Sequence, residues 1–169
     1  MAAYVIVRVD VTDPDQYAKY MKLSPGAVSA AGGRFLVRGG ATARRSIEIE
    51  SFQHQNPIPA ATRIGPLVVS SITPPTNPGS REVPDTLEEQ IENLFTHVGQ
   101  MLEGAGATWD DMAKMTFYVT DPAASRPALN GPWLERFPDP ESRPSRHNMK
   151  VEGGGPVQIS CTFVAYVEN

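Results

Sequence analysis

One long amphipathic segment in the middle of the chain constrains the fold more than any other feature. It opens with Thr86-Leu-Glu-Glu89, a capping box with Thr86 as the N-cap residue. Gly104 or Gly106 ends it. A helix with one apolar face must bury that face against another layer of structure. The residues of the apolar face recur at helical spacing: Ile91, Leu94, Phe95, Val98, Met101 and Leu102.

Short β-type segments stand on both sides of this helix and supply that layer. Alternating or β-branched residues predict strands over 46–52, 67–72, 114–119, 146–151 and 157–167. Asp121-Pro122 starts a second helix that runs to about Phe137. From residue 46 onward the order is β-β-α-β-α-β-β, which predicts an α+β fold class.

The first 40 residues form a separate pattern. A β-branched stretch over 3–9 predicts a strand, and Thr12 or Asp13 then caps a helix with Pro14 at its first position. Residues 34–38 predict a second strand. We therefore expect an N-terminal βαβ segment over 1–40, a linker over 41–45 and a main domain over 46–169. A lone βαβ piece leaves strand edges open, so its edges must pair with the main domain or with another copy, or stay poorly packed.

Composition excludes several classes of protein. The net charge of −4 and the pI near 5.4 argue against nucleic acid as the main partner. A single cysteine, Cys161, excludes an intramolecular disulfide framework and a multi-cysteine metal site. No apolar run reaches the ~18 residues that span a bilayer, so we expect no membrane partner. The N-terminus lacks a basic region and a cleavage motif, which predicts a cytoplasmic protein.

No standard catalytic motif is present, and the histidines at 54, 97 and 147 are scattered. His97 lies in the middle of the long helix and is expected to be either a solvated or a packing residue, whereas Cys161 in the last strand is expected to lie in the core. Arg146 follows a proline turn, Arg143-Pro-Ser, at the start of a strand. An arginine held there is a two-pronged donor suited to a carboxylate. The alternative is a surface arginine that merely flanks the strand.

Six elements in collinear order resemble one known family. Residues 46–169 look like the RidA/YjgF family of enamine and imine deaminases. The elements are Gly65–Ser71 (a strand ending in serine), Pro75–Val83 (a proline loop), Gln90–Gly106 (a long helix), Asp111–Val119 (a turn and strand), Asn130 with Trp133 and Phe137, and Arg143-Pro-Ser-Arg146.

The resemblance implies a chorismate-mutase-like mixed sheet with two helices on one face, assembled as a homotrimer with a cleft at each subunit interface. There Arg146 would hold the carboxylate of a small imino or enamino acid. Ser71, Asn130, His147 and Asn148 would complete the substrate-binding site. Water would attack the C=N carbon and release ammonia and a 2-oxo acid, with no metal or cofactor.

Two departures from the family pattern leave other functions open. Gln158 stands where many active deaminases have a glutamate that orients the water, and Ile72 replaces a glycine. Gln158 and His54 are the catalytic candidates. The alternatives are a non-catalytic trimer that binds small carboxylates, an aminomuconate-type deaminase of aromatic breakdown, and, less supported, a ribonuclease. Residues 1–40 resemble half of a small family of dimeric ferredoxin-like domains.

Overall fold

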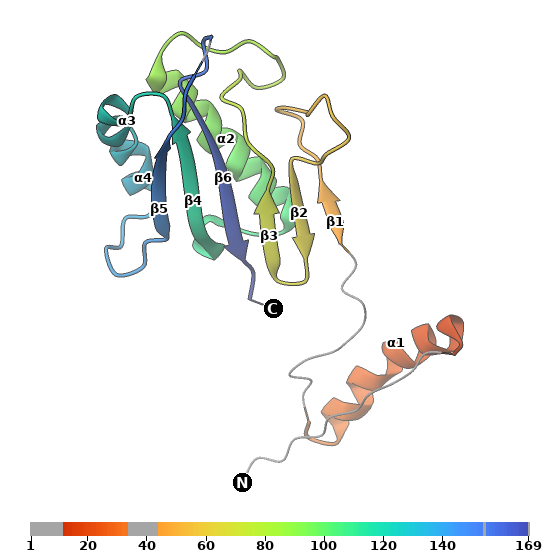
Figure 1. Cartoon of the computed structure of the whole chain (residues 1–169). Coiled ribbons are helices and arrows are strands. Elements are labelled where there is room, and N and C mark those ends of the chain that lie inside the picture. Colours follow the sequence, from red (N-terminus) through yellow and green to blue (C-terminus); the bar gives the residue numbers. More distant parts are fainter. Residues whose placement is uncertain (1–11, 34–43, 154, 169) are drawn as a thin grey trace. The chain divides into compact units, whose positions relative to one another are not determined.

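The computed structural model describes residues 12–33, 44–153 and 155–168, and the chain divides into two compact units, 1–41 and 42–169 (Figure 1). The first unit contains helix α1, Pro14–Ala30. The Asp13 carboxylate caps it by accepting the backbone N–H groups of Asp15 and Gln16 at 3.0 and 3.1 Å. The predicted cap and the proline at the first helical position are confirmed. The strands predicted over 3–9 and 34–38 lie outside the described residues.

The second unit is built on one six-stranded sheet. Its strands are β1 (Arg45–Ile47), β2 (Ala61–Ile64), β3 (Leu67–Ser70), β4 (Met112–Val119), β5 (Ser145–Lys150) and β6 (Ile159–Tyr166). Their order across the sheet is β1-β2-β3-β6-β4-β5. The β4–β5 pair is parallel, and all the other pairs are antiparallel. The predicted mixed sheet is therefore confirmed, with β1 and β5 as its edges.

Three helices cover one face of this sheet (Figure 1): α2 (Leu87–Ala105), α3 (Pro122–Ala128) and α4 (Asn130–Arg136). The Thr86 hydroxyl accepts the Glu89 N–H at 3.3 Å and donates to the Glu89 carboxylate at 2.6 Å. Gly106 ends α2 at φ 71°, a conformation that glycine adopts without strain. In the described part of the chain, no helix is both long and apolar enough to cross a membrane.

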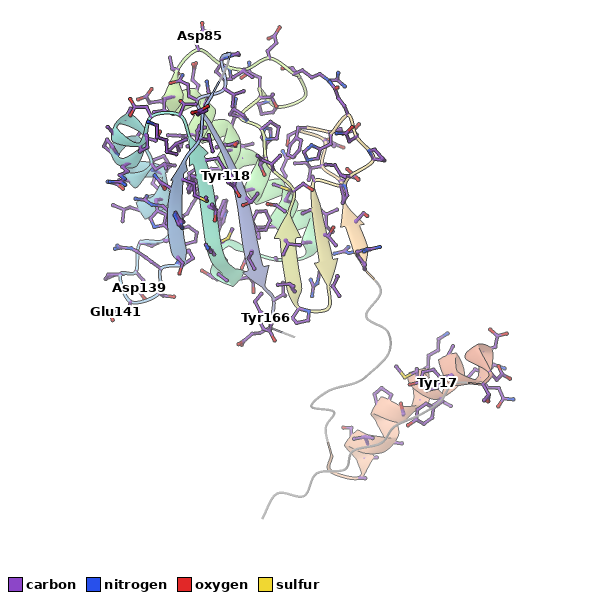
Figure 2. The ribbon with its side chains drawn as sticks, viewed as in Figure 1. Tyr17, Asp85, Tyr118, Asp139, Glu141 and Tyr166 are labelled. Atoms are coloured by element: carbon purple, nitrogen blue, oxygen red, sulfur yellow. The ribbon has the colours of Figure 1, made fainter. Side chains whose placement is uncertain are left out.

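The core lies between α2 and the sheet. Every residue of the predicted apolar face of α2 is at most 1% exposed. Alternate residues of the central strands meet that face: Met115, Phe117 and Val119 from β4, and Ile159, Cys161, Phe163 and Ala165 from β6. The opposite face of the sheet carries no helix of the second unit within its described residues. It presents Tyr118 and Tyr166, the latter 54% exposed (Figure 2).

Three details differ from the sequence prediction. The first strand covers only Arg45–Ile47 instead of 46–52. A β2–β3 hairpin, turning at Gly65 with φ 58°, was not predicted in its first arm, because residues 61–64 alternate too weakly. The helix predicted from Pro122 to Phe137 is divided into α3 and α4 at Leu129, between two prolines that cannot donate a backbone hydrogen bond.

A buried histidine joins α2 to two loops. The His97 side chain is fully buried, with Nδ1 2.7 Å from the Ser51 hydroxyl and Nε2 2.9 Å from the Thr76 carbonyl. A carbonyl can only accept, so Nε2 carries the proton and the Ser51 hydroxyl donates to Nδ1. Phe52 packs edge-on against the same ring, with centroids 5.1 Å apart. Of the two roles expected for His97, solvated or packing, the structure shows the packing role.

This arrangement predicts a stability that falls in mild acid. Burial lowers the pKa of His97 below 6.5, so the unfolded chain takes up a proton there before the folded chain does. The contribution of neutral His97 to the free energy of unfolding is complete above pH 6.5. It is lost as the pH falls through 6.5 toward the folded-state pKa of His97. We expect the free energy of unfolding to drop by up to about 1.4 kcal/mol per pH unit in that window.

The measurement is urea unfolding between pH 7.5 and 5.5, with His97→Gln as the matched variant. Glutamine keeps a donor and an acceptor but does not titrate. The difference between the two proteins should shrink as the pH falls. Parallel pH profiles would show that His97 does not contribute this dependence.

The division into two units predicts that residues 44–169 fold without the N-terminal segment. The described core of the second unit is complete in strands and helices between residues 45 and 166. Deleting residues 1–43 should therefore leave a soluble protein with a cooperative thermal transition and the same number of subunits by light scattering. Aggregation, or a change in subunit number, would show that the N-terminal segment completes the main domain or its assembly.

Candidate functional site

Arg146 lies on edge strand β5, opposite Met115 of β4. Its Nη2 donates to the Asn130 side-chain oxygen at 2.9 Å. Its guanidinium carbon stands 5.3 Å from the ring centre of Trp133, and Trp133 is itself only 6% exposed. Asn130 and Trp133 both belong to α4, so that helix sets the direction of the arginine from two sides. The Arg146 side chain is thus fixed by Asn130 and Trp133, and it is not a surface arginine that merely flanks the strand.

The Arg146 guanidinium retains unused hydrogen-bonding capacity. Half-burial of the side chain disfavours its charged form and lowers the pKa of Arg146, although an arginine remains a cation at neutral pH. Its Nη1 is buried and has no hydrogen-bond partner in the described part of the chain. The Asn148 amide nitrogen, two residues along the same strand, is in the same condition. Two buried donors without acceptors mark a position for a group that accepts hydrogen bonds.

These donors border a hollow at the β5 edge. It measures about 440 Å³ and is lined by Arg126, Arg146, His147 and Asn148. Arg126 comes from α3, and the other three residues are consecutive in β5. The lining therefore contains two cations and no carboxylate. Such a surface favours an anion, and its volume falls within the range of small-molecule sites.

The structure brings together Arg146, Asn130, His147 and Asn148 but leaves the other predicted site residues elsewhere. Ser71 follows β3, three strands from β5, which is roughly 14 Å at the usual strand spacing. Its hydroxyl donates to the Pro59 carbonyl at 2.7 Å. Within one chain, Ser71 therefore does not face Arg146.

Gln158 is also distant from Arg146. Its carbonyl accepts the Thr120 N–H at 3.0 Å, whereas Arg146 pairs with Met115, five residues earlier in β4. At strand rise this offset is roughly 16 Å. The Gln158 side chain donates to the Asp85 carbonyl at 3.0 Å. The strand predicted over 157–167 begins only at Ile159, so Gln158 precedes β6 instead of lying in it.

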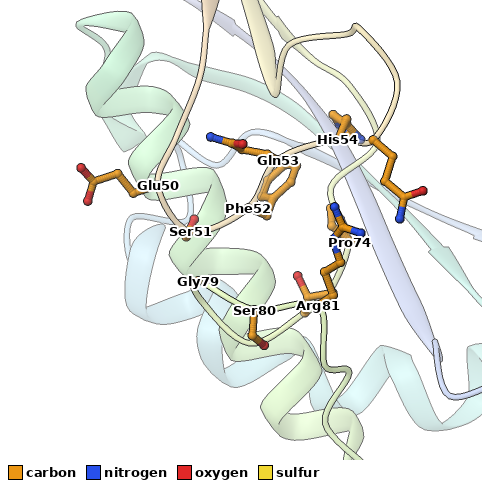
Figure 3. A pocket seen from close by; sticks show the side chains of 11 residues that line it. Glu50, Ser51, Phe52, Gln53, His54, Pro74, Gly79, Ser80 and Arg81 are labelled. Carbon is orange, nitrogen blue, oxygen red and sulfur yellow. The ribbon is translucent and has the colours of Figure 1, made fainter.

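His54 lies near the opposite edge of the sheet, in the loop between β1 and β2. It borders a second hollow of about 510 Å³ together with Phe52, Pro74 and Arg81 (Figure 3). Its ring packs edge-on against Phe52, with centroids 5.2 Å apart, and its Nε2 is buried without a partner in the described residues. Nothing in the chain's own geometry brings His54 toward Arg146.

Cys161 is a core residue, as predicted. It is fully buried in β6, and burial raises the pKa of its thiol to about 12, so it holds its proton and is a poor nucleophile at neutral pH. In the described residues, no three His, Cys, Asp or Glu side chains are grouped as metal ligands would be.

Two residues near Arg146 were not identified as functional from the sequence. Trp133 was matched only as a member of the family element that contains Asn130 and Phe137, yet its ring lies beneath the Arg146 guanidinium. Arg126 precedes Asn130 by four residues, the spacing that places two side chains on one helical face. That spacing was the signal that could have placed Arg126 beside Asn130. The prolines around these residues weakened the helical pattern on which it depends.

Comparison with known proteins supports the fold. A sequence profile described as Endoribonuclease L-PSP matches residues 48–156. A candidate endoribonuclease from Thermotoga maritima is 24% identical, with a TM-score of 0.66 over 74% of this chain and 98% of its own. The YjgF gene product of E. coli is 23% identical, with a TM-score of 0.65 over 73% of this chain and 99% of its own. E. coli TdcF with bound serine is 21% identical, with a TM-score of 0.65 over the same two shares.

The N-terminal segment matches a different profile. Residues 2–50 match a domain of unknown function, DUF1330. This match extends across the predicted linker over 41–45, and it shares three residues, 48–50, with the Endoribonuclease L-PSP match. The expectation of half a ferredoxin-like domain finds no support in this match. Among curated proteins, none matches the chain.

The second profile covers more than half of the chain, and the strand order, the three helices on one face and the solved structures all agree with it. The chain therefore belongs to the Endoribonuclease L-PSP family, also called RidA/YjgF.

Proposed function

We propose that the protein hydrolyses a small 2-imino or 2-enamino carboxylate to a 2-oxo acid and ammonia. The observation that carries this proposal is the unpartnered Nη1 of Arg146 in a hollow lined by donors. A carboxylate there would accept from Arg146 and from the Asn148 amide. The guanidinium would hold it with charge-assisted bonds, and Asn130 and Trp133 would keep the guanidinium in place.

The reaction asks little of the protein beyond positioning. Water adds to the C=N carbon while the nitrogen takes up a proton, giving a carbinolamine. The C–N bond then breaks, ammonia leaves, and the hydroxyl loses its proton to become the 2-oxo group. Iminium carbon is already electrophilic, so a fixed carboxylate and one proton relay are sufficient. His147, which lines the hollow, is the candidate for that relay.

The proposal includes a homotrimer with sites between subunits. In one chain, Ser71 and Gln158 are each more than ~10 Å from Arg146 by strand geometry. A neighbouring subunit would have to supply them. The open face of the sheet supports such packing, because Leu67, Val69 and Tyr166 are between 36% and 54% exposed there.

A binding protein without turnover is the second candidate. The hollow has no carboxylate in its described lining, and the Gln158 amide is engaged with the Asp85 carbonyl. The described residues of the hollow and Gln158 therefore provide no carboxylate base to activate water. The arginines and the Asn148 amide could still bind a carboxylate. Ribonuclease activity, named in the family description, has less support here because the net charge is −4. An aminomuconate-type deaminase remains one form of the first candidate.

Removing Arg146 tests the proposal. Arg146 would make two charge-assisted bonds to a carboxylate, each worth roughly 1.5–3 kcal/mol, so Arg146→Ala should lower kcat/KM, or the affinity for 2-oxo acids, by about two to four orders of magnitude. Arg146→Lys should recover only part of the lost kcat/KM or affinity, since an ammonium group keeps the positive charge but not the two parallel donors of a guanidinium. The readout is steady-state ammonia release, with calorimetric binding of the 2-oxo acid.

Arg143→Ala is the control. Its guanidinium donates to the carbonyls of Phe137 and Pro138 at 3.0 and 3.1 Å and does not line the hollow. We expect a modest loss of stability and unchanged kcat/KM. Unchanged 2-oxo acid affinity in a folded Arg146→Ala protein would contradict the proposed site.

A further inference from the structure

The two arginines at the hollow point to a ligand with two anionic groups. We propose that the site takes a 2-imino or 2-oxo dicarboxylate, with Arg146 holding the carboxylate next to the reacting carbon and Arg126 holding the second. This inference rests on the proposed function and narrows its substrate class.

The placement of Arg126 is the first argument. It lies in α3, which packs beside β5, and it lines the same hollow as Arg146 and Asn148. Asn130, the residue that accepts from Arg146, follows it by four positions. The backbone stays helical between them, because Leu129 has φ −72° and ψ −20°. Side chains four apart on a helix have their Cβ atoms ~5–6 Å apart. Arg126 is thus one helical turn from the group that orients Arg146.

The second argument is that Arg126 has no partner of its own. No hydrogen bond or ion pair joins its guanidinium to any described residue, and the side chain is exposed. Four arginines of the domain donate to backbone carbonyls, namely Arg45, Arg63, Arg136 and Arg143, whereas Arg44 and Arg81 are exposed and, like Arg126, form no hydrogen bond within the described residues. The structural role that explains those arginines is therefore missing at Arg126.

The third argument is charge balance. No acidic side chain lines the hollow to offset its two cations. Two like charges at one site repel each other, and a monocarboxylate would neutralise only one of them. A ligand with two separated carboxylates would neutralise both. A single phosphate group carries similar charge but in one place, so it is the competing ligand that the experiment must exclude.

The experiment compares two 2-oxo acids of equal carbon number by calorimetry on the full chain at low salt. 2-Oxoglutarate carries two carboxylates and 2-oxopentanoate carries one. We expect 2-oxoglutarate to bind the native protein about tenfold more tightly, a modest factor because Arg126 is exposed. Arg126→Gln should abolish that preference, because it weakens 2-oxoglutarate binding more than 2-oxopentanoate binding. The preference should also shrink in high salt.

Lys150→Gln is the matched control. Lys150 lies at the far end of β5, roughly 13 Å from Arg146, and its loss removes the same unit of charge outside the hollow. The preference for 2-oxoglutarate should survive it. Equal affinity of the native protein for both acids, or a preference that persists in Arg126→Gln, would overturn the inference. Tighter binding of inorganic phosphate than of 2-oxoglutarate would overturn it as well.

Arg146→Ala separates this inference from the function on which it rests. If both hold, Arg146→Ala weakens both acids, whereas Arg126→Gln weakens the dicarboxylate more than the monocarboxylate. If only the proposed function holds, Arg146→Ala still weakens both, and Arg126→Gln affects the two acids equally. If Arg146→Ala changes neither acid, the proposed carboxylate site itself is wrong.

Discussion

The candidate site depends on the single parallel strand pair of the sheet. Strand β5 lies parallel to β4, and a parallel pair requires a crossover segment that packs over the sheet. Here α3 and α4 are that crossover. They place Asn130 and Trp133 against Arg146, although 12 or more residues separate these positions in the chain. An antiparallel hairpin between β4 and β5 would leave Arg146 on a bare edge without its two supports.

The same crossover explains what the sequence could and could not predict. Alternation and helical spacing report burial directly, so the core of α2 and the central strands were predictable. Arg146 and Asn130 were predicted through family resemblance, and their contact is now seen within one chain. The β2 arm of the hairpin was not predicted, because Thr62 and Arg63 interrupt its apolar pattern. Which side chains contact an arginine on the far side of a crossover depends on the tertiary structure. No local sequence pattern predicts such contacts.

Ser71, Gln158 and His54 show the limit of sequence reasoning about a site. Each is held by contacts within its own part of the domain: Ser71 by the Pro59 carbonyl, Gln158 by the Asp85 carbonyl and His54 against Phe52. Sequence order says nothing about which of these positions a second subunit would bring to Arg146. In the single chain, the hollow is lined by two arginines, His147 and Asn148. Under the proposed function, the arginines and the amide would bind the carboxylate, and water activation would fall to His147 or to a neighbouring subunit.

The most direct test of the account is whether the protein accelerates imine hydrolysis only when a carboxylate is present. An amino acid oxidase can generate 2-iminobutanoate in place, and an amine oxidase the corresponding propylamine imine, which lacks the carboxylate. With the full chain added, we predict faster ammonia release from the first imine and the buffer rate from the second. Two results would contradict the account. One is that the folded protein accelerates ammonia release neither from 2-iminobutanoate nor from an imino dicarboxylate. The other is that it accelerates ammonia release equally from the carboxylated and the carboxylate-free imine.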